Sequence, residues 1–206
     1  MNSATGTLEA MDFSRAWVFI PAYLVAAVSV AVLYSRSRGF DVRQKDFAGA
    51  SGMGRQFGWR VGVGIAVADV LKGALAASVV RVFAPELIWF APAVIAFGHC
   101  YPMWHGFNGG QGLAPATGAL WVADAVTGAV AMLVGLLVMG VHRAFKLERF
   151  VKLGAQPLSG IVTPLVLVIV AQARVGSDGV IGVLLMTAVL LARGVHVLLS
   201  PKPGSA

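Results

Sequence analysis

The sequence predicts an all-α integral membrane protein of 206 residues. Of these residues, 58% are hydrophobic and only 12% are charged. The mean hydropathy of +0.81 lies far above that of a soluble domain. Apolar windows of helix length recur along the whole chain, and no polar linker or low-complexity tract divides them. We therefore expect residues 1–206 to form a single polytopic membrane domain.

Seven apolar segments predict seven transmembrane helices. They cover residues 16–34, 61–83, 87–103, 113–123, 124–141, 158–174 and 179–199. The first is a retained anchor rather than a signal peptide, because no basic region precedes it and no small-residue cleavage site follows it. The fourth has about 11 residues, against the roughly 20 that span a bilayer unaided, so it is short or re-entrant. Asp124 marks the turn into the fifth.

The basic residues favour seven crossings with the N-terminus outside and the C-terminus inside. Positive charge near helix ends is retained on the cytoplasmic side. Seven crossings place most of the basic residues on that side: Arg36, Arg38, Arg43, Lys45, Arg55, Arg60, Arg143, Lys146, Arg149, Lys152, Arg193 and Lys202. An alternative merges residues 113–141 into one long helix and leaves six crossings. The basic loop at 142–157 would then face outside.

The net charge of +7 follows from this sorting and from attraction to anionic headgroups. It implies membrane lipids as partners and no nucleic acid. The single cysteine, Cys100, excludes an intramolecular disulfide and a cysteine-rich metal site. We expect no metal and no cofactor.

Two ionisable residues lie inside the second predicted helix. Asp69 and Lys72 are three residues apart, so they share a helix face and can pair. An isolated charge at the centre of a membrane helix costs about 2.5 to 3.5 kcal/mol. The pair is therefore either part of a functional site or a structural pair that locks this helix to its neighbours.

A glycine-rich segment, residues 98–112, separates the third and fourth helices with the sequence GHCYPMWHGFNGGQG. Its glycines allow several backbone N–H groups to turn toward one point, a common way to hold an anion such as phosphate. The alternative is a flexible turn between two helices. On the predicted topology the segment faces the cytoplasm beside the basic loops at 35–60 and 142–157, which would steer a small anionic substrate toward it.

Four segments in order resemble the bacterial acyl-phosphate:glycerol-3-phosphate acyltransferases, the PlsY type. They are AGASGMGRQFGWR at 48–60, DVLKGA at 69–74, the glycine-rich segment, and ERFVKLG at 148–154. The resemblance covers most of the chain. It implies seven membrane helices in the inner (plasma) membrane, an extracytoplasmic N-terminus and active-site loops on the cytoplasmic side.

The resemblance also implies a reaction, the transfer of a fatty acyl group from acyl phosphate to the 1-position of glycerol 3-phosphate, which gives lysophosphatidic acid. Acyl phosphate is a mixed anhydride with a good leaving group, so the attack needs orientation and charge stabilisation more than a powerful nucleophile. The implied catalytic residues are Ser51, Arg60, His99 and Gln111. The implied substrate-binding residues are Arg55, Asp69, Lys72, Asn108, Gly109, Gly110, Gly112 and His196.

Among these residues, Arg60 and Arg55 would hold a phosphate, and the amides of Gly109 to Gly112 would cradle one. His99 would orient the segment or donate a hydrogen bond. The chain departs from the family where Asn108 and Gln111 replace typical lysines. Gln111 still offers a hydrogen bond, but a charge-assisted bond is roughly twice as strong.

The first and last motifs depart from the family as well. Three residues of the first motif, Gly52, Gln56 and Phe57, stand where the family carries asparagine, threonine and asparagine. The family's serine falls at Ala50, or at Ser51 with a one-residue slip. Near the C-terminus, Arg193 and His196 are retained without the compact basic and acidic cluster of the family.

Two functions remain open at this stage. One is a membrane acyltransferase that uses glycerol 3-phosphate or a related acceptor. The other is a non-catalytic relative that binds a lipid, an acyl phosphate or a membrane partner. Retention of the glycine frame favours the acyltransferase. A small transporter is a weaker alternative, because no repeat halves or paired broken helices appear.

Overall fold

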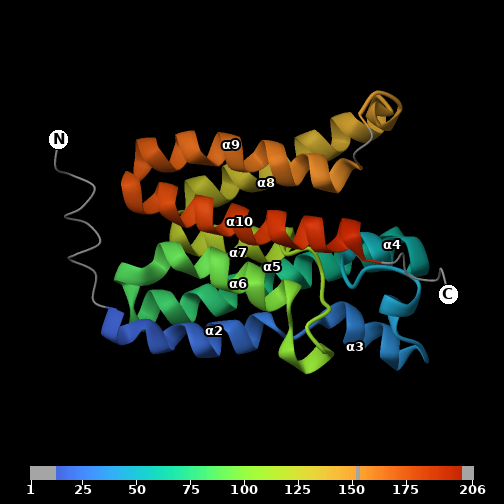
Figure 1. Cartoon of the computed structure of the whole chain (residues 1–206), viewed down its shortest axis with the longest axis horizontal. Helices are drawn as coiled ribbons and strands as arrows, with labels where there is room; N and C mark the ends of the chain where they lie inside the picture. Colours follow the sequence, from blue (N-terminus) through green and yellow to red (C-terminus); the bar gives the residue numbers. More distant parts are fainter. Residues whose placement is uncertain (1–12, 152–153, 201–206) are drawn as a thin grey trace.

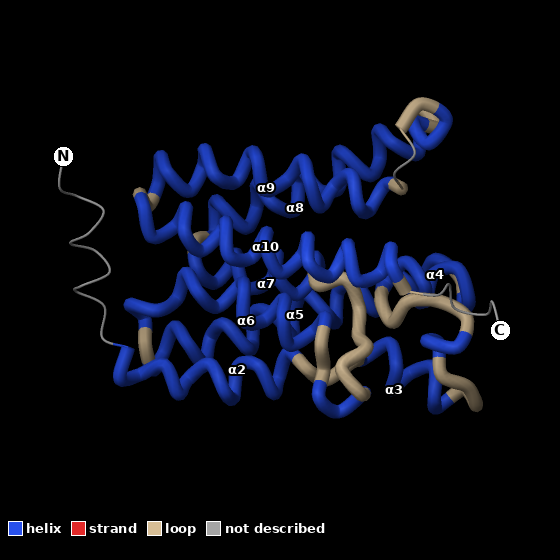
Figure 2. The backbone as a smooth tube through the Cα atoms, in the orientation of Figure 1, coloured by secondary structure: helices blue, strands red, loops and turns tan. Residues whose placement is uncertain are grey.

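The computed structural model describes residues 13–151 and 154–200, and every regular element in these ranges is helical (Figures 1 and 2). The predicted all-α class is therefore confirmed. The α-helices are Phe19–Ala26 (α2), Val30–Ser37 (α3), Ala50–Phe57 (α4), Trp59–Phe83 (α5), Ala91–Cys100 (α6), Leu113–Ala123 (α7), Ala125–Ala144 (α8), Ala155–Arg174 (α9) and Ser177–Leu199 (α10). Short 3-10 helices are Phe13–Val18 (η1), Val42–Gln44 (η2), Pro85–Phe90 (η3), Met103–His105 (η4) and Leu147–Arg149 (η5).

The long helices pack side by side along the longest axis of the molecule (Figure 1). Helix α5 packs most extensively on α7 and also contacts α2 and α4, while α10 connects the α8–α9 pair to α6. Glycines allow the closest approach: Gly73 on α5 lies against the carbonyl oxygen of Pro115, and Gly118 on α7 lies against that of Val70. The core of the bundle is thus set by backbone contact between α5 and α7.

Six helical segments in the described part of the chain are long and apolar enough to cross a membrane. They are Phe13–Ser37, Trp59–Phe83, Pro85–His105, Ala125–Ala144, Ala155–Arg174 and Ser177–Leu199. The fourth predicted segment forms the shorter apolar helix α7, with the bounds expected from the sequence. The number of crossings and the orientation of the termini stay predictions.

The alternative single helix over residues 113–141 is wrong, because the chain turns at Asp124. This residue is extended (φ −153°, ψ 117°). Its carboxylate accepts hydrogen bonds from the Thr127 amide at 2.8 Å and the Thr127 hydroxyl at 2.7 Å. An aspartate at this position supplies the acceptor that the first turn of a helix lacks, so α7 ends and α8 begins here.

The first predicted helix is interrupted, which the sequence did not indicate. Helix α2 ends at Ala26 and α3 begins at Val30. Ser29 is extended, and its hydroxyl accepts a hydrogen bond from the Val32 amide, which caps α3. The carbonyl of Val28 accepts a hydrogen bond from Lys72 Nζ at 2.7 Å. A side chain on α5 therefore satisfies a backbone group that the interruption leaves open.

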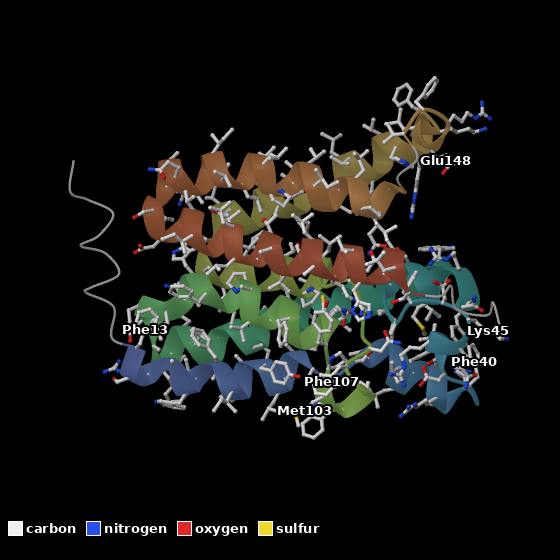
Figure 3. All side chains as sticks on the ribbon, in the orientation of Figure 1. Phe13, Phe40, Lys45, Met103, Phe107 and Glu148 are labelled. Atoms are coloured by element: carbon white, nitrogen blue, oxygen red, sulfur yellow. The ribbon has the colours of Figure 1, made fainter. Side chains whose placement is uncertain are left out.

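The polar segments gather at one end of the bundle. Phe40, Lys45 and Glu148 lie at the end opposite Phe13 (Figure 3). The loops at 35–60 and 142–157 thus share one end, as expected. The first of them also contains α4, a helix that the sequence did not predict.

We expect Gly73→Ala to destabilise the protein, because a Cβ at this position would overlap the Pro115 carbonyl and push α7 away from α5. Overpacking of this kind costs about 1–3 kcal/mol. The matched control is Gly64→Ala on the same helix, where an added methyl group would meet nothing within 4 Å. Thermal unfolding of the detergent-purified protein should show a lower melting temperature for Gly73→Ala only. Equal melting temperatures for the two variants would contradict this packing.

Candidate active site

A buried cluster of charged and polar groups lies beneath the polar end. Lys72 Nζ is 3.2 Å from Asp69 Oδ1, which confirms the pairing expected from their spacing. The amine also lies 3.0 Å from His99 Nδ1. An ammonium has no acceptor, so Nδ1 accepts and the histidine proton resides on Nε2. Asp69, Lys72 and His99 are all buried, so the cluster ties α5 to the end of α6.

The glycine-rich segment folds back on α6 immediately above this cluster. The amides of Gly109 and Gly110 donate to the carbonyls of Cys100 at 3.1 Å and His99 at 3.2 Å. These two amides are thus occupied, whereas the sequence led us to expect them to face a phosphate. A Cβ on Gly110 would overlap His99 Nε2 and approach the Ala48 carbonyl oxygen to 2.6 Å. Glycine is required here because the backbone lies directly against the imidazole ring.

Two arginines hold the other edge of the segment. Arg43 Nη1 donates to the His105 carbonyl at 2.5 Å and to the Asn108 carbonyl at 3.2 Å. Arg193 on α10 donates to the carbonyls of Gly109 at 2.6 Å and Gly110 at 3.0 Å. The segment is therefore fixed from both sides. It is not a flexible turn in this structure.

The larger of two pockets at this end has a volume of about 370 Å³. It lies between the segment that precedes α4, the glycine-rich segment and the end of α10. Its lining includes two arginines, a histidine, an aspartate, an asparagine and three aromatic rings: Arg43, Arg193, His196, Asp46, Asn108, Tyr101, Phe47 and Phe107. Phe107 is 58% exposed at the rim, so polar groups line the pocket beside an apolar surface.

The smaller pocket shares Phe47 with the larger one, since this residue lines both. Its volume of about 20 Å³ leaves room for about one water molecule. Ser51, Arg55 and Gln111 line it, together with Gln156 at the start of α9. Gly112 caps the N-terminus of α7 beside Gln111 with φ +83°, a conformation that favours glycine.

Two arginines at the polar end form ion pairs with carboxylates. Arg43, which precedes α4, pairs with Asp41, and Arg55 on α4 pairs with Asp46. Hydrogen bonds from Arg43 hold the pKa of Asp41 well below its ordinary value. Burial raises the pKa of Asp46, but the bonds from Arg55 and from the Phe47 amide outweigh it, so this pKa is lowered as well. Arg55 contacts Asp46 through two nitrogens, at 2.6 and 2.8 Å. The smaller pocket consequently carries little net charge.

The structure brings the expected site residues into three groups. Ser51, Arg55, Gln111 and Gly112 lie at the smaller pocket or beside it, and Asn108 and His196 line the larger one. The buried group, Asp69, Lys72 and His99 with Gly109 and Gly110, lies under both and lines neither. Arg60 is exposed on the first turn of α5 with its guanidinium 5.6 Å from the Trp59 ring, and it lines neither pocket.

Several residues that line the pockets were not expected from the sequence, among them Arg43, Arg193 and Gln156. Arg43 was assigned only to charge sorting, and Arg193 to charge sorting and to a retained motif. A basic residue about two turns inside an apolar helix end was a usable signal for Arg193, because such a residue needs partners. Among the described residues, no three His, Cys, Asp or Glu side chains come together in a way that would hold a metal ion.

Comparison with known proteins shows the family to which the chain belongs. The sequence matches the family described as glycerol-3-phosphate acyltransferase over residues 16–197. It is 36% identical over 190 residues to glycerol-3-phosphate acyltransferase 2 of Deinococcus radiodurans, covering 90% of this chain and 95% of that protein. It is 30% identical over 151 residues to glycerol-3-phosphate acyltransferase 3 of Bacillus anthracis. This match covers 71% of this chain and 76% of that protein.

Solved structures show the same fold. The crystal structure of PlsY (YgiH) in its glycerol 3-phosphate form has a TM-score of 0.70 and 24% identity, over 90% of this chain and 92% of that chain. The lysophosphatidic acid form of the same enzyme has a TM-score of 0.68 and 23% identity over the same shares.

We expect Lys72→Met to destabilise the protein strongly, because it leaves the Asp69 carboxylate buried without a cation. Breaking a buried ion pair costs about 3–5 kcal/mol. The double variant Asp69→Asn/Lys72→Met removes the unpaired charge and should recover part of the loss. Thermal unfolding of the single and double variants measures this coupling. A double variant that is less stable than Lys72→Met would refute it.

Proposed function

Because the chain belongs to the glycerol-3-phosphate acyltransferase family, we propose that it transfers a fatty acyl group from acyl phosphate to glycerol 3-phosphate and forms lysophosphatidic acid. The protein is a multi-pass membrane acyltransferase. We further propose that it lies in the bacterial plasma membrane with its N-terminus outside, so that both pockets open to the cytoplasm. The loops at that end carry most of the basic residues, which supports this orientation.

One observation carries the proposal for the acceptor. The larger pocket collects two arginines and a histidine from segments far apart in the sequence, in a volume of about 370 Å³. Cations and polar groups of this kind suit a small phosphorylated polyol. We assign glycerol 3-phosphate to this pocket.

The smaller pocket suits the phosphate of the acyl donor. Arg55, Ser51 and Gln111 provide hydrogen-bond donors beside the N-terminus of α7, where the helix dipole favours an anion. The pocket of about 20 Å³ is too small for a phosphate while Arg55 holds Asp46. The donor phosphate would replace Asp46 as the partner of Arg55, and the pocket would widen as that exchange occurs.

The acyl chain needs an apolar surface that reaches the lipid. Phe107 lines the larger pocket and is mostly exposed, and the neighbouring Met103 and Trp104 are exposed as well. Met103 and Phe107 lie on the outer side of the bundle, away from the helix core (Figure 3). We assign the acyl chain to this apolar surface.

The chemistry requires positioning more than a strong base. An acceptor hydroxyl oxygen attacks the carbonyl carbon, and the carbon–oxygen bond to phosphate breaks. The hydroxyl proton leaves with the released phosphate, so atoms and charge balance. Two pockets that share Phe47 would bring the reactants together, which removes much of the entropic barrier to the reaction. Donors at Arg55 and Ser51 would stabilise the charge that develops on the phosphate.

Purified protein in detergent or lipid should form lysophosphatidic acid from acyl phosphate and glycerol 3-phosphate. In this assay Arg55→Gln should lower kcat/KM by about 100-fold, because it removes a charged donor from the reacting phosphate. Arg60→Gln is the matched control, and its exposed cation–π contact suggests a loss below about fivefold. A larger loss of kcat/KM in Arg60→Gln than in Arg55→Gln would support the expectation from the sequence that Arg60 holds a phosphate. Ligand binding without turnover on any acyl phosphate or acyl thioester would favour the non-catalytic alternative.

Gln111→Lys should lower the Michaelis constant for acyl phosphate by roughly fivefold. It adds a charge-assisted hydrogen bond to a pocket whose arginine is already balanced by Asp46. Gln111→Met is the control of similar length, and it should raise the constant because it removes the donor. Steady-state kinetics with both substrates varied gives the two values. Unchanged constants in both variants would exclude Gln111 from the phosphate site.

A further inference from the structure

Arg193 stands out among the cations at the polar end because it is buried. Its side chain is only 2% exposed, although it lies on α10 near the end of an otherwise apolar helix. The guanidinium projects under the glycine-rich segment and lines the larger pocket. Residues 98–112 contain no lysine or arginine of their own. Arg193 therefore brings a positive charge to a segment that has none.

The contacts of Arg193 divide its guanidinium into two edges. Nε donates to the Gly110 carbonyl, and Nη2 donates to the Gly109 carbonyl and, at 3.1 Å, to Asn108 Oδ1. These acceptors are all neutral. Nη1 forms no hydrogen bond with any described residue, and it is not among their fully enclosed unpaired polar atoms. Nε and Nη2 hold the segment, and Arg193 also lines the larger pocket.

The neighbouring cations form ion pairs with carboxylates, whereas Arg193 forms none with the described residues. Arg43 pairs with Asp41, Arg55 with Asp46, and Lys72 with Asp69. In residues 13–151 and 154–200, no carboxylate forms an ion pair with Arg193. A buried charge without a counter-charge is costly. The carbonyl dipoles and the Tyr101 ring, whose centroid lies 5.5 Å from the Arg193 guanidinium carbon, offset only part of that cost. An anion bound in the larger pocket would supply the negative charge that Arg193 lacks.

We infer that Arg193 is the phosphate-binding residue of the larger pocket and supplies from α10 a cation that the glycine-rich segment lacks. Its Nε and Nη2 hold Asn108, Gly109 and Gly110 in place while Nη1 binds the phosphate of the acceptor. The inference rests on the proposed function for the identity of that acceptor. The need for an anion at Arg193 follows from burial and charge alone.

Asn108→Lys tests the inference because its effect on the affinity for glycerol 3-phosphate should change sign when the charge at position 193 is removed. In the otherwise wild-type protein, the introduced lysine would lie beside Arg193, and the like charges should weaken binding of glycerol 3-phosphate by about tenfold. Arg193→Gln keeps an amide donor for the carbonyls but removes the charge, and it should weaken binding by about 100-fold. In that background Asn108→Lys returns a cation to the same place and should strengthen binding by at least about tenfold.

Affinity is measured on the full-length protein in detergent by ligand-induced thermal stabilisation, with glycerol 3-phosphate and inorganic phosphate as probes. Size-exclusion profiles check folding, and Arg193→Lys, which keeps the charge, should stay within about tenfold of the wild type. The inference is overturned if Asn108→Lys acts in the same direction in both backgrounds, or if Arg193→Gln binds like the wild type. Charge-reversible phosphate binding without acyl transfer would sink the proposed function and leave the inference standing.

Discussion

The polar end of the molecule depends on one buried amine, that of Lys72. An ammonium in an apolar bundle must find hydrogen-bond acceptors or a counter-charge, and Lys72 finds them on three separate elements. These are the Val28 carbonyl in the interruption between α2 and α3, Asp69 on its own helix, and His99 at the end of α6. The interruption of the first membrane segment and the position of α6 are therefore linked. The Val28 carbonyl gains a donor from this link, and the Lys72 amine gains one of its three partners.

His99 contacts both Lys72 and the glycine-rich segment, so it links the buried amine to the site. Its ring is fixed through Nδ1 by Lys72, and its Nε2 edge lies where a Cβ of Gly110 would be. The glycine-rich segment can only lie this close to the ring as bare backbone, and its amides then bond to the last carbonyls of α6. Gly109 and Gly110 thus serve packing in this structure. This explains why the glycine frame persists in a chain whose Asn108 and Gln111 stand in place of cations.

The sequence predicts the parts of this fold that are determined by residues close together in the chain. The bounds of α7, the turn at Asp124 and the Asp69–Lys72 pair follow from apolar length, capping and helical spacing, and the family resemblance was confirmed. Helix α4 was missed because ASGMGRQF is short and rich in glycine. The interruption at residues 27–29 was missed because it lies in an apolar run, with its partner 44 residues away. Arg193 was undervalued for the same reason, since its acceptors lie more than 80 residues away.

The placement of charge on a helix rather than on the glycine-rich segment has a physical consequence. A lysine on a loop would be solvated and mobile before substrate arrives, so binding would have to order it. Arg193 is already ordered, because α10 fixes its backbone and three neutral acceptors fix its guanidinium. Its desolvation occurs during folding instead of during binding. On the proposed assignment, the donor phosphate must displace Asp46 from Arg55, whereas no described carboxylate pairs with Arg193 and would have to be displaced by the acceptor phosphate. The acceptor should therefore bind without the exchange that the donor requires.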